Sequence, residues 1–243
     1  MHRFFFQDIH RENDRVQLDE AESRHALSVL RLKKGARIVL LDGLGGVFEA
    51  EVEEAGKPLL TARILGALPD HEAHARVTLY QGLPKADKLE WILQKCTELG
   101  VHAVQPVQFA RSVPETGKGA DKRLERLRRI AREATKQSGR GQVPMVGQVR
   151  TLPEVLGRIA AHGRVIVPWE EAQGTRLCDV IDAAAPAQEI ALVIGPEGGI
   201  TPEEMAQLAE IGGQAVTLGS RILRTETAAI AALAGIFTLT GDM

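Results

Sequence analysis

Residues 189–199 read Glu-Ile-Ala-Leu-Val-Ile-Gly-Pro-Glu-Gly-Gly, and residues 201–204 continue as Thr-Pro-Glu-Glu. The continuous apolar run is of strand length and predicts a strand buried on both faces. The glycine-rich loop ends this strand. The threonine, proline and glutamate that follow form a capping-box pattern, which satisfies free backbone donors and starts a helix. This stretch therefore predicts a strand, a loop and a helix in succession.

A second unit of the same kind follows it. Two glycines at 212–213 end the helix, residues 215–218 predict a short strand, and the loop 219–224 leads into a helix from about Thr225. That helix is apolar nearly all round over 228–239. Such a helix is expected to be buried, either in a domain core or in a subunit interface.

The two loops indicate a ligand site. If the two strands are parallel and adjacent, both loops lie at carboxyl ends of strands, where open α/β sheets bind ligands. The first loop combines three glycines, which permit close backbone approach, with a rigid proline. A plain helix-entry turn is the alternative. A second glycine loop carrying two arginines makes that alternative less favoured.

The rest of the chain separates into two parts. Strands are expected at 76–81, 101–109 and 164–168, and helices at 86–99, 121–138 and 152–161. This alternation predicts an α/β domain with a largely parallel sheet. The first seventy residues are mostly β, with strands at 36–41, 47–52 and 59–65. A small hairpin-rich barrel is expected there.

Two segments of this first part have competing interpretations. Residues 39–46 resemble the glycine loop of Rossmann-type methyltransferases, but that loop must open into a helix, and here an alternating strand follows. We interpret it as a hairpin turn. Residues 68–75 are polar and contain a proline, so they are the expected linker. His71 and His74 are expected to be solvated there, because no metal-site pattern accompanies them.

Composition bounds the class of protein. The 243 residues suit a small domain followed by a larger one, and no apolar run reaches membrane-spanning length. The Phe4-Phe-Phe6 run is too short for a signal peptide. Cys96 and Cys178 form no disulfide or CxxC pattern, which is typical of a reducing compartment. A soluble, cytoplasmic protein is expected.

Charge is unevenly distributed. The whole chain carries a net charge of −2, which argues against nucleic-acid binding by the entire surface. Between Arg111 and Arg140, however, ten basic residues stand against four acidic ones, a local charge of +6. A solvated helix face is the ordinary explanation. An RNA-binding stripe is modestly favoured, because clustered cations are the electrostatic footprint of phosphate contacts.

Several motifs together resemble a known family. They are Ile194-Gly-Pro-Glu-Gly-Gly-Ile-Thr-Pro-Glu-Glu204, Leu218-Gly-Ser-Arg-Ile-Leu-Arg-Thr-Glu-Thr-Ala228, the opening His2-Arg-Phe-Phe5, His25-Ala-Leu-Ser-Val-Leu-Arg31, Gly82-Leu-Pro-Lys85 and Lys95-Cys-Thr-Glu-Leu-Gly100. Over nearly the whole chain the sequence is similar to SPOUT methyltransferases, and within them to the group that methylates N3 of a uridine in 16S ribosomal RNA.

The resemblance implies a fold and partners. It implies a PUA-like β-barrel RNA-binding domain at 1–70 and a trefoil-knotted α/β methyltransferase domain at 75–243. It also implies a homodimer, S-adenosyl-L-methionine as cofactor, and 16S rRNA or the assembled small subunit as substrate. No metal is expected. Knotted chains are rare among proteins, and the knot is expected here from the resemblance alone.

The resemblance and the chemistry together nominate site residues. Arg224 is expected to stabilise charge on a uracil oxygen, and Glu226 to orient or accept the N3 proton. The alternative for residues 225–227 is a simple helix start, with Thr225 as the cap and Glu226 favoured by the helix dipole. The expected cofactor contacts are Val167, Pro168, Gly195, Pro196, Glu197, Gly198, Gly199, Leu218, Gly219, Arg221, Ile222 and Leu223. The expected RNA contacts are Arg3, Arg24, Arg31, Lys85, Lys88, Arg111, Lys136 and Arg140.

Two other functions stay open. A SPOUT enzyme that methylates the ribose 2′-oxygen is the nearest alternative. A non-catalytic ribosome-assembly factor would bind RNA through the barrel and the basic stripe, but it would have no need of two glycine loops. A nucleotide-binding enzyme is disfavoured, because the sequence has no P-loop.

Overall fold

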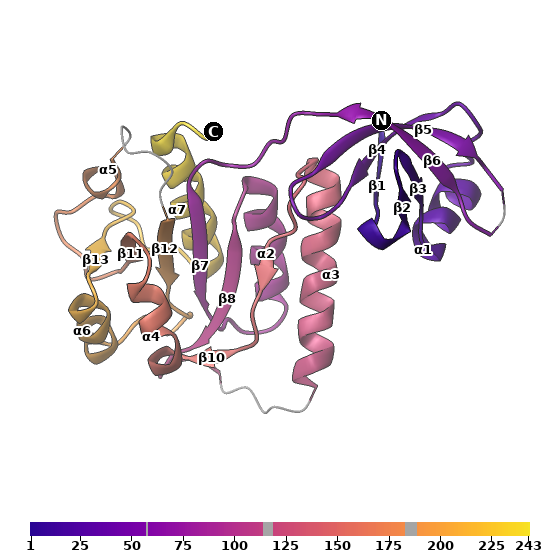
Figure 1. The fold of residues 1–243 in the computed structure, drawn as a ribbon. Coiled ribbons are helices and arrows are strands. Elements are labelled where there is room, and N and C mark those ends of the chain that lie inside the picture. The colour runs from indigo at the N-terminus through magenta and orange to yellow at the C-terminus, as the bar shows by residue number, and fades with distance from the viewer. Residues whose placement is uncertain (57, 114–118, 183–188) are drawn as a thin grey trace. The chain divides into compact units, whose positions relative to one another are not determined.

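The structure, a computed structural model, describes residues 1–56, 58–113, 119–182 and 189–243. It forms two compact units (Figure 1). The N-terminal unit contains residues 1–72 together with 132–143. The C-terminal unit contains residues 73–131 and 144–243.

A parallel sheet forms the centre of the C-terminal unit. Its strands lie in the order β10-β8-β7-β12-β11-β13, and β9 pairs with β8 beside this path. Every pairing is parallel. The strands are β7 (Arg76–Gly82), β8 (Ala103–Gln108), β9 (Met145–Val146), β10 (Arg150–Thr151), β11 (Arg164–Pro168), β12 (Glu189–Ile194) and β13 (Gly213–Val216).

Helices cover both faces of this sheet (Figure 1). The helices of this unit are α2 (Lys88–Leu99), α4 (Leu152–Ala160), α5 (Leu177–Val180), α6 (Pro202–Glu210), α7 (Thr225–Thr240) and the part of α3 (Ala120–Ser138) that precedes residue 132. Apolar side chains of α4 and α6 pack with Tyr80, Ala191 and Val193 on one face. Helix α7 contacts β7, β12 and α2 on the other. The α/β prediction is confirmed, and among the described residues no helix is both long and apolar enough to cross a membrane.

The stretch at 189–204 folds as its sequence predicts. Strand β12 has the predicted bounds, and α6 begins at Pro202 behind a capping box. Glu204 N donates to Thr201 Oγ1 at 3.2 Å, while Thr201 N donates to Glu204 Oε2 at 3.0 Å. The predicted start of α7 at about Thr225 is also confirmed.

The strand predicted at 215–218 is displaced. Strand β13 covers Gly213–Val216, so Thr217 and Leu218 belong to the loop. The expectation that the two glycine loops follow adjacent strands is also wrong. Strand β11 lies between β12 and β13 and pairs with both. The reason is that β12 pairs on its other side with β7, so β13 has to join the sheet beyond β11.

A six-stranded, mostly antiparallel sheet builds the N-terminal unit. Its order is β1-β4-β5-β6-β3-β2, with only the β1 and β4 pairing parallel. The elements are β1 (His2–Phe5), η1 (Asp8–His10), β2 (Arg11–Glu12), β3 (Arg15–Gln17), α1 (Glu20–Arg24), a π-helical turn η2 (His25–Val29), β4 (Arg37–Leu41), β5 (Val47–Glu54) and β6 (Thr61–Ala67).

The hairpin interpretation of residues 39–46 is confirmed. Strands β4 and β5 pair antiparallel on either side of Asp42. The Asp42 Oδ1 atom accepts hydrogen bonds from Leu44 N at 2.7 Å and from Gly46 N at 2.8 Å. An aspartate that binds backbone donors two and four residues ahead stabilises a turn, not a helix entry.

Residues 132–143 complete the N-terminal unit. Val143 packs against a small core that includes Phe5 and Leu41. The Lys136 ammonium lies 2.6 Å from Glu22 Oε2, and the Arg132 guanidinium lies 3.9 Å from the centre of the Phe5 ring. The N-terminal unit is therefore built from two segments that are far apart in sequence.

The segment expected to be a solvated linker is anchored at one histidine. His74 N donates to Asp242 Oδ1 at 2.6 Å, and His74 Nδ1 lies 3.0 Å from the same oxygen. The His74 side chain is otherwise exposed, whereas the Asp242 side chain is only 2% exposed. No group of three or more metal-binding side chains occurs within the described ranges.

Candidate functional site

A cavity of about 490 Å³ opens where β11, β12 and β13 end. Its volume lies within the range of small-molecule sites, which is roughly 300–1,000 Å³. It is lined by Lys88, Pro168, Trp169, Glu170, Ile194, Gly195, Pro196, Glu197, Gly199, Thr217, Leu218, Gly219, Ser220, Arg221, Ile222, Leu223, Arg224, Thr225 and Ala228. The two glycine loops therefore come together, because β11 places their strands on either side of it.

Close backbone contacts shape the first loop. A Cβ atom added at Gly82 would lie 2.5 Å from Pro196 N, so the end of β7 can approach the loop only as glycine. Gly199 has φ of +76°, which a side chain rarely tolerates. Gly198 instead faces Arg111, whose Nη1 donates to Gly198 O at 3.0 Å. The loop is thus held rigidly at the cavity wall.

The second loop is more open. Gly219 has φ of +112° and no atom within 4 Å of an added Cβ. Its N–H donates to Thr217 Oγ1 at 3.1 Å, and the same hydroxyl donates to Gly219 O at 3.1 Å. Ile222 is 87% exposed although it lines the cavity. This loop therefore presents backbone and an apolar side chain to a ligand.

Lys88 lines the cavity and joins Glu197 of the cavity wall to Glu226 in the first turn of α7, a predicted catalytic residue that is not among the lining residues. Its Nζ donates to Glu197 Oε1 at 3.0 Å and lies 3.3 Å from Glu226 Oε2. The hydrogen bond to Glu197 and the nearby Glu226 raise the pKa of Lys88. Burial raises the pKa of Glu197, but hydrogen bonds from Lys85 N and Lys88 outweigh it and leave that pKa below its usual value. Lys88 is therefore charged at neutral pH.

The two carboxylates differ in their hydrogen bonds. Glu197 accepts from Lys85 N at 3.0 and 3.2 Å and from Lys88 Nζ at 3.0 Å. Glu226 Oε2 is shielded from solvent and forms the ion pair with Lys88, but it accepts no well-aligned hydrogen bond from any residue that the structure describes. A buried acceptor in this state favours a ligand that brings an N–H or O–H donor. Glu226 is thus the carboxylate with free accepting capacity.

The start of α7 differs from the predicted cap. Arg224 occupies the N-cap position with an extended backbone, and no side chain caps the helix there. The Thr225 hydroxyl donates to Gly195 O at 2.6 Å. The interpretation of Thr225 as a helix cap is therefore wrong, because its side chain bonds the other loop of the cavity.

Most residues predicted to contact the cofactor line this cavity. Two do not. Val167 is fully buried in the core with α4 and α6, since alternate residues of β11 face opposite sides of the sheet. Gly198 faces Arg111, as described above. Sequence reasoning missed Trp169, Glu170 and Thr217. Trp169 and Glu170 follow directly on a predicted strand end, which was the available signal.

Three predicted RNA contacts have structural partners in the N-terminal unit. Arg3 Nη1 donates to Lys136 O at 3.4 Å and to Gln137 O at 3.1 Å, at the carboxyl end of α3. Lys136 binds Glu22. Arg140 is 3% exposed and binds Glu72 through Nε and Nη2. Each of these cationic groups is bound to protein oxygen atoms, so a phosphate would have to share or replace these bonds, and the three RNA contacts stay predictions.

The other predicted RNA contacts lie at the surface or in the cavity. Lys88 belongs to the cavity, and Arg111 is exposed but holds Gly198 O. Arg24, Arg31 and the Lys85 side chain are exposed, and within the described ranges none has a side-chain partner. These three stay available for phosphate contacts.

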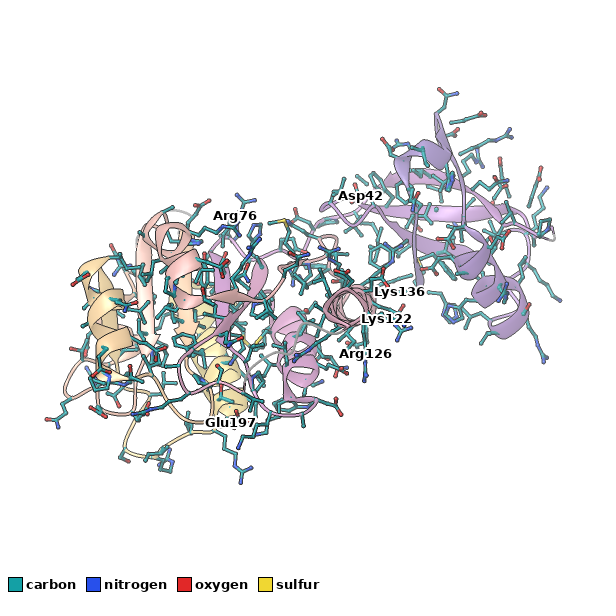
Figure 2. The ribbon with its side chains drawn as sticks, turned by 90° about the horizontal axis from the view of Figure 1, so that it is seen from below. Asp42, Arg76, Lys122, Arg126, Lys136 and Glu197 are labelled. Carbon is teal, nitrogen blue, oxygen red and sulfur yellow. The ribbon has the colours of Figure 1, made fainter. Side chains whose placement is uncertain are left out.

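The basic helix predicted at 121–138 is confirmed as α3. Leu124, Leu127 and Ala131 are buried, which leaves a charged face to solvent. That exposed face carries Lys122, Arg126, Arg128 and Arg129, and Figure 2 shows the first two projecting from the same stretch of helix. Arg126 Nη2 donates to Glu90 Oε2 at 2.7 Å. Lys118 and Glu115 of the predicted stripe lie outside the described residues.

The residues of the cavity fit S-adenosylmethionine. Backbone groups of both glycine loops and the apolar Pro168, Leu218 and Leu223 suit an adenosine. The Glu197 carboxylate at the cavity wall suits a cationic sulfonium. No phosphate-binding fingerprint occurs, which agrees with a cofactor that has no phosphate.

Comparison with known proteins gives the family. The RNA methyltransferase domain family matches residues 71–236, and the RNA methyltransferase PUA domain family matches residues 18–65. Ribosomal RNA small subunit methyltransferase E of Mycobacterium bovis is 40% identical over 92% of this chain and 86% of its own length. The protein of that name in Bacillus subtilis is 36% identical over 97% and 96%.

A solved structure agrees with these relatives. Ribosomal RNA small subunit methyltransferase E from Neisseria gonorrhoeae, solved bound to S-adenosyl methionine, superposes with a TM-score of 0.87 at 37% identity. The match covers 98% of both chains. Family, domain content and fold therefore lead to one conclusion: this chain belongs to the ribosomal RNA small subunit methyltransferase E family.

Proposed function

We propose that the chain transfers the methyl group of S-adenosylmethionine to N3 of a uridine in 16S ribosomal RNA. One observation carries this proposal. In the first turn of α7, beside the cavity, Glu226 Oε2 is shielded from solvent and forms an ion pair with the Lys88 ammonium at 3.3 Å, without a well-aligned hydrogen bond from any described residue. Uracil N3–H is a donor of the kind that this acceptor lacks.

The chain's own groups would hold the cofactor. Residues Gly195–Gly199 and Leu218–Leu223, with Pro168, supply backbone and apolar contacts around the cavity. When bound, S-adenosylmethionine supplies a methyl group activated by its sulfonium. Holding that methyl in line with the nucleophile can contribute about 7–11 kcal/mol of the rate acceleration.

The remaining acceleration comes from making N3 electron-rich. Glu226 accepts the N3 proton, so that the nitrogen lone pair is free to take the methyl group. Arg224, at the cavity wall, stabilises the negative charge that spreads onto the uracil oxygens. The Lys88 ammonium forms ion pairs with both Glu197 and Glu226 and so holds the two carboxylates near each other. A cytosine ring offers an acceptor at N3, so a carboxylate at this place would disfavour it.

Several features of the wider molecule belong to the same proposal. Residues 1–70 form the RNA-binding domain and 75–243 the methyltransferase domain, with 132–143 packed into the former. The enzyme acts in the cytoplasm as a homodimer with a trefoil knot, and recognises the assembled small subunit. Support for RNA recognition comes from the exposed cations of α3 and the match to a PUA domain.

Transfer of labelled methyl to unmodified 16S rRNA tests the function. The RNA is offered both naked and in assembled small subunits, and the product nucleoside is identified. Label in 3-methyluridine supports the proposal, and the better substrate form shows what is recognised. Label on ribose would instead support the 2′-O alternative. No label on either substrate, despite cofactor binding, would contradict the proposal and favour an assembly role.

A further inference from the structure

A buried glutamine lies directly beneath the cavity. Gln81 is the penultimate residue of β7, is 0% exposed, and pairs in register with Ile194 at the end of β12. Its neighbour Gly82 is the residue that admits the backbone of Pro196. Gln81 therefore occupies the point where β7 meets the first glycine loop.

The side chain of Gln81 starts a chain of hydrogen bonds. Its Nε2 donates to Gly82 O at 3.0 Å and to Thr225 Oγ1 at 2.9 Å. The Thr225 hydroxyl in turn donates to Gly195 O at 2.6 Å. Both amide protons and the hydroxyl proton are used, so the donor directions are consistent. The chain connects β7, the first residue of the cofactor loop and the first residue of α7.

This arrangement has a cost in stability. Gln81 Oε1 is buried and has no hydrogen-bond partner among the described residues. An unpaired buried acceptor is unfavourable, and an apolar side chain of similar size would avoid it. Packing alone therefore does not explain a glutamine here. A need to hold Thr225 in a fixed position explains the glutamine, because buried polar groups that lower stability are concentrated at functional sites.

Thr225 lies between the two residues proposed to act on the uracil. Arg224 precedes it and Glu226 follows it, so the backbone of Thr225 sets where both side chains begin. Reacting groups need placement within about 0.5 Å. No side chain caps α7, which leaves the Thr225 hydroxyl to tie its first turn to Gly195.

We propose that Gln81 and Thr225 are positioning residues, which hold the first turn of α7 in register with the cofactor loop for methyl transfer. This inference rests on the proposed function. Neither residue exchanges a proton with the substrate. Their effect is on the placement of Arg224 and Glu226.

Matched variants of the full chain separate positioning from packing. Thr225→Val removes the hydroxyl and keeps the shape, while Thr225→Ser keeps the hydroxyl. Gln81→Met removes the amide. At saturating cofactor and RNA, we expect single-turnover methyl transfer to fall at least tenfold in the Val and Met variants. The Ser variant should stay within threefold of the native protein, and dissociation constants for S-adenosylmethionine should change less than threefold throughout.

Coupling between the two positions is a second readout. If both belong to one chain of bonds, the Gln81→Met/Thr225→Val double variant should lose little more rate than either single variant. Native rates in Thr225→Val would overturn the inference. A rate loss in Thr225→Val that saturating cofactor restores would overturn it too, because that would place the defect in cofactor binding alone.

Hydrogen exchange tests the positioning without any substrate. The Ala228 amide makes a helical bond to Arg224 O at 2.7 Å, so its exchange reports on the first turn of α7. We expect faster exchange there in Thr225→Val than in Thr225→Ser. Equal exchange would overturn the inference. An inactive native protein would instead contradict the proposed function and leave this readout valid.

Discussion

Lys88 Nζ lies 3.0 Å from Glu197 Oε1 and 3.3 Å from Glu226 Oε2, so one ammonium connects the first glycine loop with the first turn of α7. The two carboxylates come from segments that are 29 positions apart in sequence, and Lys88 comes from a third. The Lys88 side chain is 31% exposed and the Glu226 side chain 16%. Variants of these three residues can therefore distinguish a residue that acts on the substrate, as proposed for Glu226, from one that shapes the site, as proposed for Glu197.

Lys88→Met should lower the rate of methyl transfer. It should leave the slope of log RNA affinity against log salt unchanged. Without the ammonium, the Glu197 and Glu226 carboxylates lose the cation that both of them contact. We expect methyl transfer to fall at least tenfold, with partial recovery in Lys88→Arg. The control is Lys95→Met on the same helix, because the Lys95 ammonium pairs with Glu98 and does not line the cavity. An RNA contact at Lys88 would show as a reduced salt slope in Lys88→Met.

Glu226→Gln and Glu197→Gln should have different effects. Loss of the proton acceptor should lower the single-turnover rate by about 10²–10⁴-fold and leave cofactor affinity within threefold. Glu197→Gln should weaken cofactor binding, because Glu197 ties the loop to Lys85 N and Lys88. Calorimetry and rapid quench measure the two quantities. Glu203→Gln, at an exposed position of α6, is the control. If Glu197→Gln lowered the rate and Glu226→Gln weakened cofactor binding, Glu197 would be the base.

Arg224→Ala should abolish methylation and leave cofactor binding largely intact. Removing one group that stabilises developing charge costs roughly 10²–10³-fold in rate. Equilibrium binding of S-adenosylmethionine and single-turnover transfer to small subunits are measured together. Arg221→Ala, in the same loop, is expected to change affinity instead. Unchanged turnover in Arg224→Ala would remove this residue from the mechanism.

Arg140→Met should destabilise the N-terminal unit, whereas Arg128→Ala should weaken RNA binding. Removing Arg140 leaves the partly buried Glu72 carboxylate without its counter-charge and with the hydrogen bond from Gln142 N, a loss on the order of 3–5 kcal/mol for a buried pair. Arg128 is exposed on α3, so its removal should lower the slope of log affinity against log salt by about 1. Chemical denaturation and salt titration check both. An intact free energy of unfolding in Arg140→Met would contradict the structural role.

Asp242→Asn should lower stability at neutral pH but much less at acid pH. Burial raises the pKa of Asp242, but hydrogen bonds from His74 N, Thr240 Oγ1 and Ala75 N outweigh it and hold that pKa below its usual value. The carboxylate therefore stabilises the fold above a pH of about 4, the ordinary aspartate pKa. This stabilisation is lost as the pH falls through the depressed pKa of the folded state.

The measurement is the free energy of unfolding from pH 7 down to pH 3. We expect a deficit on the order of 2 kcal/mol for Asp242→Asn at pH 7, which narrows toward pH 3. Asp70→Asn, at an exposed position, should show no such deficit. A deficit that is constant with pH would show that the charge of Asp242 does not contribute.

Local patterns in the sequence predicted the elements that form the cavity. The apolar run of β12, the capping box at Thr201 and the start of α7 depend on neighbours within a few residues, and the structure has all three. Glycine and proline content likewise marked both loops. For this reason most predicted cofactor contacts line the cavity.

Tertiary structure decided what depends on distant partners. Sequence patterns record which residues can start a helix or form a strand, but strand order and ion pairs depend on residues far along the chain. Strand β11 lies between β12 and β13, Lys88 binds Glu197 and Glu226, and residues 132–143 complete the N-terminal unit. A basic residue looks the same in sequence whether it faces solvent or, like Arg140, is bound to a carboxylate. Burial and pairing belong to the folded chain, so only the tertiary structure separates surface cations from structural ones.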